Sequence, residues 1–236
     1  MPPVFLIGGG RGSEAIRASH EGFVRAAGGG PIAVVVLDEG DDTDPDRWSA
    51  ALALAGAREV HELVVSASRP PRASDLEGAT GVFVAGGWVP GYHEALVGAG
   101  TAWLPRDVAY AGFSAGAAIA AERAIIGGWR LNGVAVCAPE AGEDLDELAI
   151  APGLGLTPFA VDVHATQWGT LTRLVHAVAA GLVPEGWAVD EGTALVLDRH
   201  AEPRVTGIGS AYRVGREGER LSVTVARTAS AGARDR

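Results

Sequence analysis

A regular alternation of short β-branched runs with amphipathic stretches constrains the fold most, and it fills the first half of the chain. Amphipathic stretches predict one helix over residues 13–27 and a second from Pro45, with Asp44 as its N-cap, to about Ala55. This alternation is typical of a parallel sheet covered by helices. The sequence therefore predicts an α/β fold of three layers, with a mostly parallel, doubly wound sheet and helices on both faces. The expected strands are Val4–Ile7, Ile32–Leu37, Val60–Val65, Gly81–Val84 and Ala109–Phe113.

The pattern changes after Ile126 to shorter pieces. Strand-like segments lie at 133–136 and 159–163, and a helix is expected from about Trp168 to Ala180. Residues 187–189 and 194–197 are expected to form a strand pair.

We expect residues 205–226 to form an antiparallel edge hairpin with its turn at 215–218. A homodimer paired through this hairpin is compatible with the sequence, since exposed strand edges tend to pair. No Pro/Gly/Ser linker is long enough to separate two domains, so we expect a single domain over 1–227 and a frayed tail at 228–236.

The charged residues exclude several classes of function. The chain has 29 acidic and 19 basic residues, a net charge of -10, and every basic residue is Arg. We therefore expect neither nucleic acid nor an anionic membrane as a partner. The lack of Lys removes Schiff-base chemistry, the P-loop lysine and Ser/Lys dyads. Chemistry must come from Ser, His, Asp, Glu or Cys137.

Cysteine and apolar content bear on the compartment. One Cys allows no intrachain disulfide and no zinc ribbon. The longest strongly apolar runs, such as Ile32–Leu37, fall far short of the ~20 residues that a membrane helix needs. Residues 1–7 lack a basic region and a long apolar region, so we interpret them as a strand rather than a signal peptide. The expectation is a soluble, cytoplasmic protein.

A Gly-x-Ser-x-Gly motif lies where a predicted strand ends. It reads GFSAG from Gly112 to Gly116 around Ser114, and small residues at 115–121 follow it as a tightly packed helix. This strand-to-helix junction is where a nucleophile elbow lies. Ser114 would there adopt a strained backbone conformation, and the two glycines would let strand and helix approach closely. Because 34 of the 236 residues are glycine, the motif can also arise by chance. Its position between a predicted strand and a predicted helix is what supports the functional interpretation.

A glycine pair and a histidine follow two other predicted strands. Gly86 and Gly87 would leave backbone N–H groups free, as an oxyanion donor requires, although a plain turn explains the pair equally well. His164 ends the segment at 159–163, just before a helix. Asp190 and Glu191 are adjacent carboxylates at a strand end, an arrangement that is usually a solvated turn unless a nearby group needs orienting.

Together these segments resemble the serine peptidases that include aspartyl dipeptidase and cyanophycinase, on a class I glutamine-amidotransferase-like fold. The resemblance runs over residues 4–197, and the order and spacing of its pieces make it specific. The matching pieces are GGG at 8–10, AGG at 85–87, GFSAGA at 112–117, DVH at 162–164 with Arg173 and Leu174, and DEGTAL at 190–195.

The resemblance implies a nucleophile, a base and an oxyanion hole. Ser114 would be the nucleophile and His164 the general base and then the acid. The N–H groups of Gly87 and Ala115 would bind the oxyanion, with Gly86 beside them. The reaction would need no cofactor, and the substrate would be a small peptide or amide.

The sequence does not decide which carboxylate orients His164. The cyanophycinase-like pattern favours Glu191. Asp190, Asp162 and Glu140 are the alternatives, and Glu140 fits the dipeptidase branch, whose acidic residue lies between nucleophile and histidine.

Departures from the family pattern concern the substrate pocket. Trp88 follows the glycine pair where the family often has a polar residue. After His164 the chain has Gln167, Trp168 and Thr170 where cyanophycinase-like sequences tend to have an aromatic residue and arginines, which could grip an acidic substrate. We therefore expect the acidic specificity to be lost and a flatter, more apolar pocket to be lined by Trp88 and Trp168.

Two other classes of function compete. Gly8, Gly10 and Asp38 lie where a dinucleotide-binding fingerprint would have them, but Ser13 occupies the place of its third glycine. The other alternative is a non-catalytic or glutaminase-like member of the same fold. A glutaminase would need Cys at the elbow, and Cys137 lies elsewhere, so the catalytically inactive member is the version that remains. A metal site is not expected, since the histidines show no spaced pair and the acidic run at 41–46 lacks the downstream Glu of a calcium loop.

Overall fold

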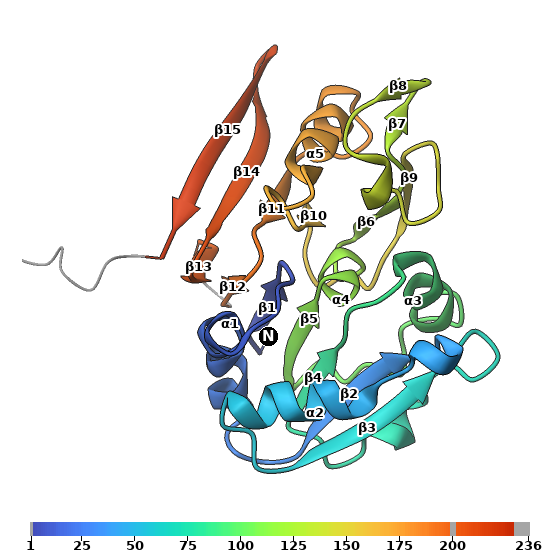
Figure 1. Ribbon diagram of the computed structural model, residues 1–236, viewed down its shortest axis with the longest axis vertical. Helices are drawn as coiled ribbons and strands as arrows, with labels where there is room; N and C mark the ends of the chain where they lie inside the picture. The colour runs from blue at the N-terminus through green and yellow to red at the C-terminus, as the bar shows by residue number, and fades with distance from the viewer. Residues whose placement is uncertain (1, 199–201, 229–236) are drawn as a thin grey trace, which may run out of the picture.

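The main sheet has seven strands and crosses the molecule (Figure 1). A computed structural model describes residues 2–198 and 202–228, so residues 229–236 of the expected tail lie outside the described residues. The strand order is β13-β12-β1-β5-β4-β2-β3. The strands are β1 (Val4–Ile7), β2 (Ile32–Leu37), β3 (Val60–Val65), β4 (Gly81–Val84), β5 (Ala109–Phe113), β12 (Thr193–Leu197) and β13 (Arg204–Gly207).

The five strands of the first half run parallel to one another, as the sequence pattern predicts. Their residues are buried, apart from those of β3 at the sheet edge. Near-continuous apolar runs of this kind are typical of strands that are covered on both faces. Strand β12 joins β1 in the antiparallel direction, with Val4 opposite Leu197, and β13 adds a second antiparallel strand.

Helices cover both faces of this sheet, which confirms the predicted fold class. On one face α1 packs against α2, and on the other α3 packs against α4. Asp44 caps α2 by accepting a hydrogen bond from Arg47 N–H at 3.1 Å, and Pro45 is the first helical residue, as predicted. The helices are α1 (Ser13–Ala26), α2 (Pro45–Leu54), α3 (Val89–Leu96), α4 (Ala115–Ala118) and α5 (Thr170–Ala179), with 3-10 turns η1 (Gly40–Asp42), η2 (Ala73–Leu76) and η3 (Pro139–Ala141).

A second sheet lies beyond α4, in the order β10-β11-β14-β15. Its strands are β10 (Ala160–Val163), β11 (Gly186–Val189), β14 (Ser210–Glu217) and β15 (Arg220–Arg227), and α5 packs on it. Two small antiparallel pairs complete the fold: β6 (Arg123–Gly127) with β9 (Ala149–Pro152), and β7 (Arg130–Leu131) with β8 (Val134–Ala135).

The predicted strand pair at 187–189 and 194–197 is wrong. Strand β11 pairs with β10 and β14 in the smaller sheet, whereas β12 pairs with β1 and β13 in the main sheet. The chain passes between the sheets at residues 190–192, where Asp190 N–H donates to Ser210 and Gly192 N–H donates to Gly9. A short link that contains a glycine resembles a hairpin turn in sequence. In the structure this link instead takes the chain from the smaller sheet to the main sheet.

The C-terminal hairpin is present but shorter than predicted. It comprises β14 and β15, while β13 belongs to the main sheet. Strand β15 is the edge strand and leaves Leu221, Val223 and Val225 exposed. Helix α4 is also shorter than the predicted run at 115–121, and α5 begins at Thr170, so Trp168 lies in the turn before it. Among the described residues no helix has the length and apolar character needed to cross a membrane.

Candidate active site

Ser114 lies in a sharp turn between β5 and α4. Its φ and ψ are 49° and -109°, a backbone conformation that a residue with a side chain rarely adopts. Gly112 and Gly116 permit this turn, because a Cβ on Gly112 would lie 2.3 Å from the Gly116 backbone and one on Gly116 would lie 2.3 Å from the Val84 carbonyl oxygen. The geometry is that of a nucleophile elbow.

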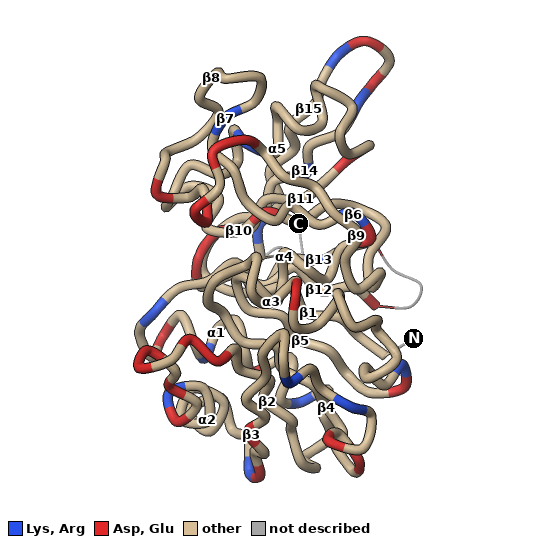
Figure 2. The backbone as a smooth tube through the Cα atoms, turned by 90° about the vertical axis from the view of Figure 1, so that its right-hand side faces the viewer, with Lys and Arg blue, Asp and Glu red and all other residues tan. Residues whose placement is uncertain are grey.

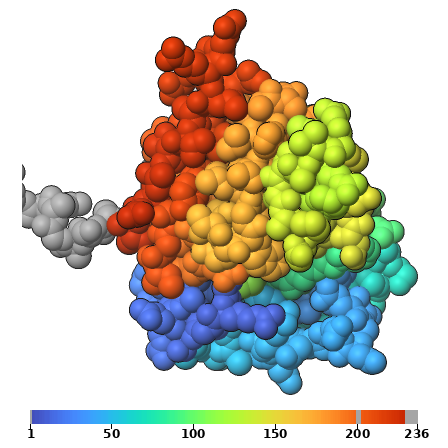
Figure 3. Space-filling view, turned by 45° about the horizontal axis from the view of Figure 1, so that its top comes forward, coloured from blue at the N-terminus to red at the C-terminus, as the bar shows by residue number. Residues whose placement is uncertain are grey.

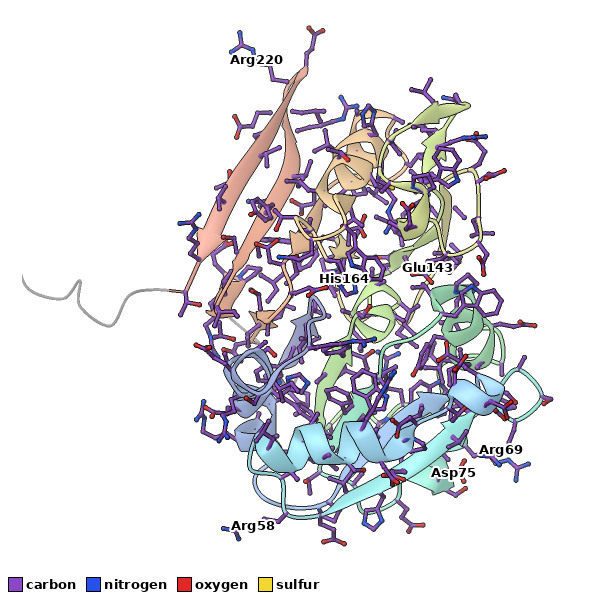
Figure 4. All side chains as sticks on the ribbon, in the orientation of Figure 1. Arg58, Arg69, Asp75, Glu143, His164 and Arg220 are labelled. Atoms are coloured by element: carbon purple, nitrogen blue, oxygen red, sulfur yellow. The ribbon has the colours of Figure 1, made fainter. Side chains whose placement is uncertain are left out.

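His164 approaches Ser114 from the end of β10. Its Nε2 atom is 2.8 Å from Ser114 Oγ, although the two residues belong to different sheets. The imidazole stacks on the indole of Trp168, with ring centroids 4.0 Å apart, and also lies against the backbone of Gly9. A Cβ on Gly9 would lie 2.1 Å from His164 Cε1, so only glycine leaves room for the ring. In Figure 4 His164 lies centrally, between the two halves of the molecule.

Glu191 is the carboxylate that contacts His164. Its Oε1 is 2.8 Å from His164 Nδ1, and its backbone N–H donates to Gln167 Oε1 at 3.0 Å. A carboxylate only accepts hydrogen bonds, so His164 Nδ1 carries the proton and Nε2 is the acceptor for the Ser114 hydroxyl. Gln167 thus holds the backbone of Glu191, a role that the sequence did not specify.

The other three candidate carboxylates have different partners. Asp190 accepts hydrogen bonds from Thr166, Ser210 and Tyr212. Asp162 pairs with Arg173 through two hydrogen bonds of 2.7 and 2.9 Å.

Glu140 lies in η3, on the rim of the cleft that contains Ser114. It makes no hydrogen bond to His164 within residues 2–198 and 202–228.

Burial lowers the pKa of His164, and the hydrogen bond and negative charge of Glu191 partly oppose that effect. The ring is therefore neutral at pH 7 and available as a base.

Gly86 passes close to Ser114, as a Cβ on Gly86 would lie 3.1 Å from Ser114 Cβ, and Gly87 lines the same cleft. Neither Gly87 N–H nor Ala115 N–H has a hydrogen-bond acceptor in the part of the chain that the structure describes. The next amide is occupied, because Trp88 N–H donates to Glu39 Oε1 at 2.8 Å. The two free amides are the ones that the resemblance implies for an oxyanion hole.

Glu39 and Glu143 are site residues that the sequence reasoning missed. Glu39 follows β2, which lies next to β4, so its position at the carboxyl end of a parallel strand was a usable signal. Glu143 accepts a hydrogen bond from Val89 N–H at 3.1 Å, and burial raises its pKa. It has a φ of 56°, and no sequence pattern marked it.

The cleft around Ser114 has a volume of about 1270 Å³ and is lined by both halves of the chain. Figure 3 shows these halves meeting, the N-terminal one in blue and cyan and the C-terminal one in yellow to red. Trp88 and Trp168 line it, each 44% exposed. The expectation of an apolar pocket accounts for these indoles but not for the carboxylates beside them, which are Glu39, Asp44, Glu140, Glu143, Asp144, Asp146 and Glu191.

The glycine turn after β1 is where the dinucleotide-binding alternative would place a phosphate. In the structure this turn packs against residues of the candidate site. His164 occupies the space beside Gly9, and Gly192 N–H lies 2.8 Å from the position of a Cβ on Gly10. The described residues contain no group of three or more His, Cys, Asp or Glu side chains that could hold a metal ion.

Comparison with known proteins identifies similar folds. No family model and no curated protein matches the chain. A peptidase from an acI-B1 Actinobacterium has a similar structure, with a TM-score of 0.63 and 15% identity over 98% of this chain and 96% of that one. "A Putative Peptidase E Protein" from Listeria monocytogenes EGD-e has a TM-score of 0.57 and 17% identity over 89% of this chain and 100% of that one. At such identities the likeness establishes the shared α/β fold.

Proposed function

We propose that this protein is a serine-type peptidase or related amide hydrolase that works through an acyl-enzyme. The observation that carries the proposal is the chain of two 2.8 Å hydrogen bonds that links Ser114, His164 and Glu191. These residues follow three separate strands, β5, β10 and β11, and meet at one cleft, beside two backbone amides without an acceptor among the described residues. The descriptions of both structural neighbours as peptidases support the same reading.

In the first half of the reaction, Ser114 Oγ attacks the carbonyl carbon of the scissile amide while its proton moves to His164 Nε2. The carbonyl oxygen becomes an oxyanion, and the N–H groups of Gly87 and Ala115 are the donors available to it. Glu191 accepts a hydrogen bond from His164 Nδ1–H, stays ionised and so stabilises the imidazolium. The C–N bond then breaks as His164 gives its proton to the leaving amine.

In the second half, water attacks the ester carbonyl of the acyl-enzyme and transfers a proton to His164 Nε2. The C–O bond to Ser114 breaks, and His164 returns the proton to Oγ. A carboxylic acid leaves and the free enzyme is restored. Each step uses the same three side chains, so loss of any one of them affects acylation and deacylation alike.

A fluorophosphonate probe, which phosphonylates activated serines, tests this proposal. We expect one equivalent of label on Ser114, located by peptide mass spectrometry, and no label on Ser114→Ala. Ser74→Ala removes an exposed serine far from the cleft and should label like the wild type. A neutral His164→Gln variant should label at least 100-fold more slowly, because it lacks the base.

Failure of the folded wild type to label would contradict the proposal and favour the inactive alternative. Equal labelling of several serines would contradict it as well, because the activation would then not belong to Ser114.

A further inference from the structure

Carboxylates dominate both walls of the cleft. Seven carboxylate side chains line it, against the two guanidinium groups of Arg11 and Arg47. Glu39 and Asp44 lie in the segment that leads into α2, and four further acidic residues of the lining belong to the segment 139–146. Figure 2 shows acidic positions, in red, gathered along the left-hand edge of the backbone, from α2 up to β7.

These charges are not neutralised by the protein. Apart from Glu191 with His164, no carboxylate of the cleft forms an ion pair with a described residue. Their hydrogen-bond partners are neutral: Trp88 N–H donates to Glu39 and Trp129 Nε1–H donates to Asp146. Carboxylates that line a concave site concentrate a negative potential in it, and this attracts cations.

An independent feature points to a ligand in the same cleft. His20 and Trp48 line it, they are 1% and 7% exposed, and neither His20 Nε2 nor Trp48 Nε1 has a partner among the described residues. Buried polar atoms without a partner are rare in folded proteins.

The roles of these two atoms follow from their neighbours. Ser19 Oγ donates its proton to the Ala15 carbonyl at 2.7 Å, so it accepts from His20 Nδ1, which is 2.8 Å away. Nε2 is then an acceptor, and because burial lowers the pKa of His20 to about 4 it stays neutral at pH 7. Trp48 Nε1–H is a donor. One acceptor and one donor match the N–H and C=O groups of a peptide.

The exposed indoles fit the same occupant. Trp88 and Trp168 line the cleft and are each 44% exposed, and indole faces attract ammonium and guanidinium groups. Arg130 already lies over Trp129, 3.8 Å from the ring centroid, which is an example of this contact beside the cleft.

We propose that the cleft selects cationic peptides, in which a guanidinium or ammonium group lies next to the scissile amide. This inference rests on the proposed function, whose site it shares. The carboxylates of both walls and the two indoles hold the cation, while His20 and Trp48 meet the peptide backbone. An acidic side chain at the same place is repelled.

Matched substrates test the selection. Peptide amides that differ only by Arg, Lys, Leu or Asp beside the scissile bond are compared, each with a free and an acetylated N-terminus. We expect kcat/KM to be at least tenfold higher for Arg or Lys than for Leu, and lowest for Asp, with the difference shrinking as salt is raised. Acetylation distinguishes the sources: an equal fall in kcat/KM for all four peptides assigns the cation to the terminal ammonium, and a preference for Arg and Lys that persists after acetylation assigns it to the side chain.

A charge-neutral double variant, Glu140→Gln with Asp144→Asn, changes two exposed carboxylates of the cleft. It should raise KM for the Arg peptide about fivefold and leave the Leu peptide within twofold. The matched control, Glu217→Gln with Glu219→Gln, removes the same charge at the tip of the β14–β15 hairpin, near Arg220 in Figure 4, and should leave both unchanged. An equal effect of both double variants would overturn the inference.

Binding to Ser114→Ala separates this inference from the proposed function. Titration of the uncleaved Arg, Leu and Asp peptides should give the tightest binding for Arg. If the wild type labels at Ser114 but the variant binds all three alike, the charge selection is wrong and the hydrolase proposal stands. If the wild type does not label but the variant still prefers the Arg peptide, the hydrolase proposal is wrong and the charge selection stands.

Discussion

The imidazole of His164 lies parallel to the indole of Trp168, with an interplanar angle of 7° and ring centroids 4.0 Å apart. The backbone of Gly9 also lies against the ring, nearest to its Cε1 atom. His164 is therefore confined by both neighbours while its two nitrogens contact Ser114 and Glu191. This confinement explains why burial is the largest influence on its pKa.

Replacement of Trp168 by Ala should raise the pKa of His164 toward 6.5, because the imidazole gains water and its charged form is no longer disfavoured. The base must be neutral, so activity is lost as the pH falls through this pKa, and the acid limb of kcat/KM should move to higher pH. We also expect about a tenfold fall in kcat/KM at pH 7 from looser positioning. Trp168→Phe keeps an aromatic cover and should keep the wild-type limb. An unchanged limb in Trp168→Ala would contradict the role of the indole.

Replacement of Glu191 by Gln should lower kcat by about 10³- to 10⁴-fold, because an amide no longer fixes the proton on His164 Nδ1 or stabilises the imidazolium. The melting temperature should change little, since this carboxylate is partly exposed. Glu185→Gln removes a carboxylate from an exposed pair with Arg213 and serves as the control, with kcat unchanged. A kcat within tenfold of the wild type for Glu191→Gln would move the orienting role to another carboxylate.

Replacement of Asp190 by Asn should cost stability rather than chemistry. The carboxylate of Asp190 accepts hydrogen bonds from Thr166, Ser210 and Tyr212, and it is 5% exposed. An amide NH₂ would face donors, and we expect a loss of about 2–4 kcal/mol in the free energy of unfolding, measured with urea. Tyr212→Phe removes one of these bonds and should cost about 1 kcal/mol. Labelling of Ser114 per folded molecule should persist in both variants.

Replacement of His20 by Leu should flatten the dependence of stability on pH. The unfolded chain binds a proton at this residue below pH 6.5, whereas the folded chain does so only near pH 4. The free energy of unfolding of the wild type should therefore fall as the pH drops from 6.5 to about 4, by about 3 kcal/mol from this group. Urea titrations at pH 7 and pH 4.5 should show a smaller difference in the variant. An equal difference in both proteins would rule out His20 as the source.

Replacement of Arg173 by Met should cost about 3–5 kcal/mol, because it leaves Asp162 buried without its partner. Arg173 also donates to the carbonyl groups of Gly128 and Ala141, and so ties α5 to the segment that forms one wall of the cleft. Adding Asp162→Asn to the variant should recover part of the loss, as measured by thermal unfolding. No recovery would show that the contacts with the two carbonyl groups, rather than the charge pair, dominate.

The sequence by itself determined the five parallel strands of the main sheet and the character of the turn at Ser114. Strands β1 to β5 follow from local apolar runs, and Gly112 and Gly116 mark a turn whose requirement for glycine is local. The apolar runs of buried strands and the need for glycine in a tight turn both depend on residues that are close together in the sequence. Helix α3 was not predicted. The pair β6–β9 and the division of the C-terminal strands between two sheets were not predicted either, because pairing partners far apart in sequence leave no local periodicity.

Only the tertiary structure decided which carboxylate meets His164 and what surrounds Ser114. Asp190 and Glu191 are neighbours with the same chemistry, yet the crossing between the sheets sends Asp190 toward β14 and Glu191 toward the imidazole. The acidic walls likewise arise from segments about one hundred residues apart that converge on one cleft. Such selection depends on the direction of side chains in space, which is fixed when the two sheets pack together.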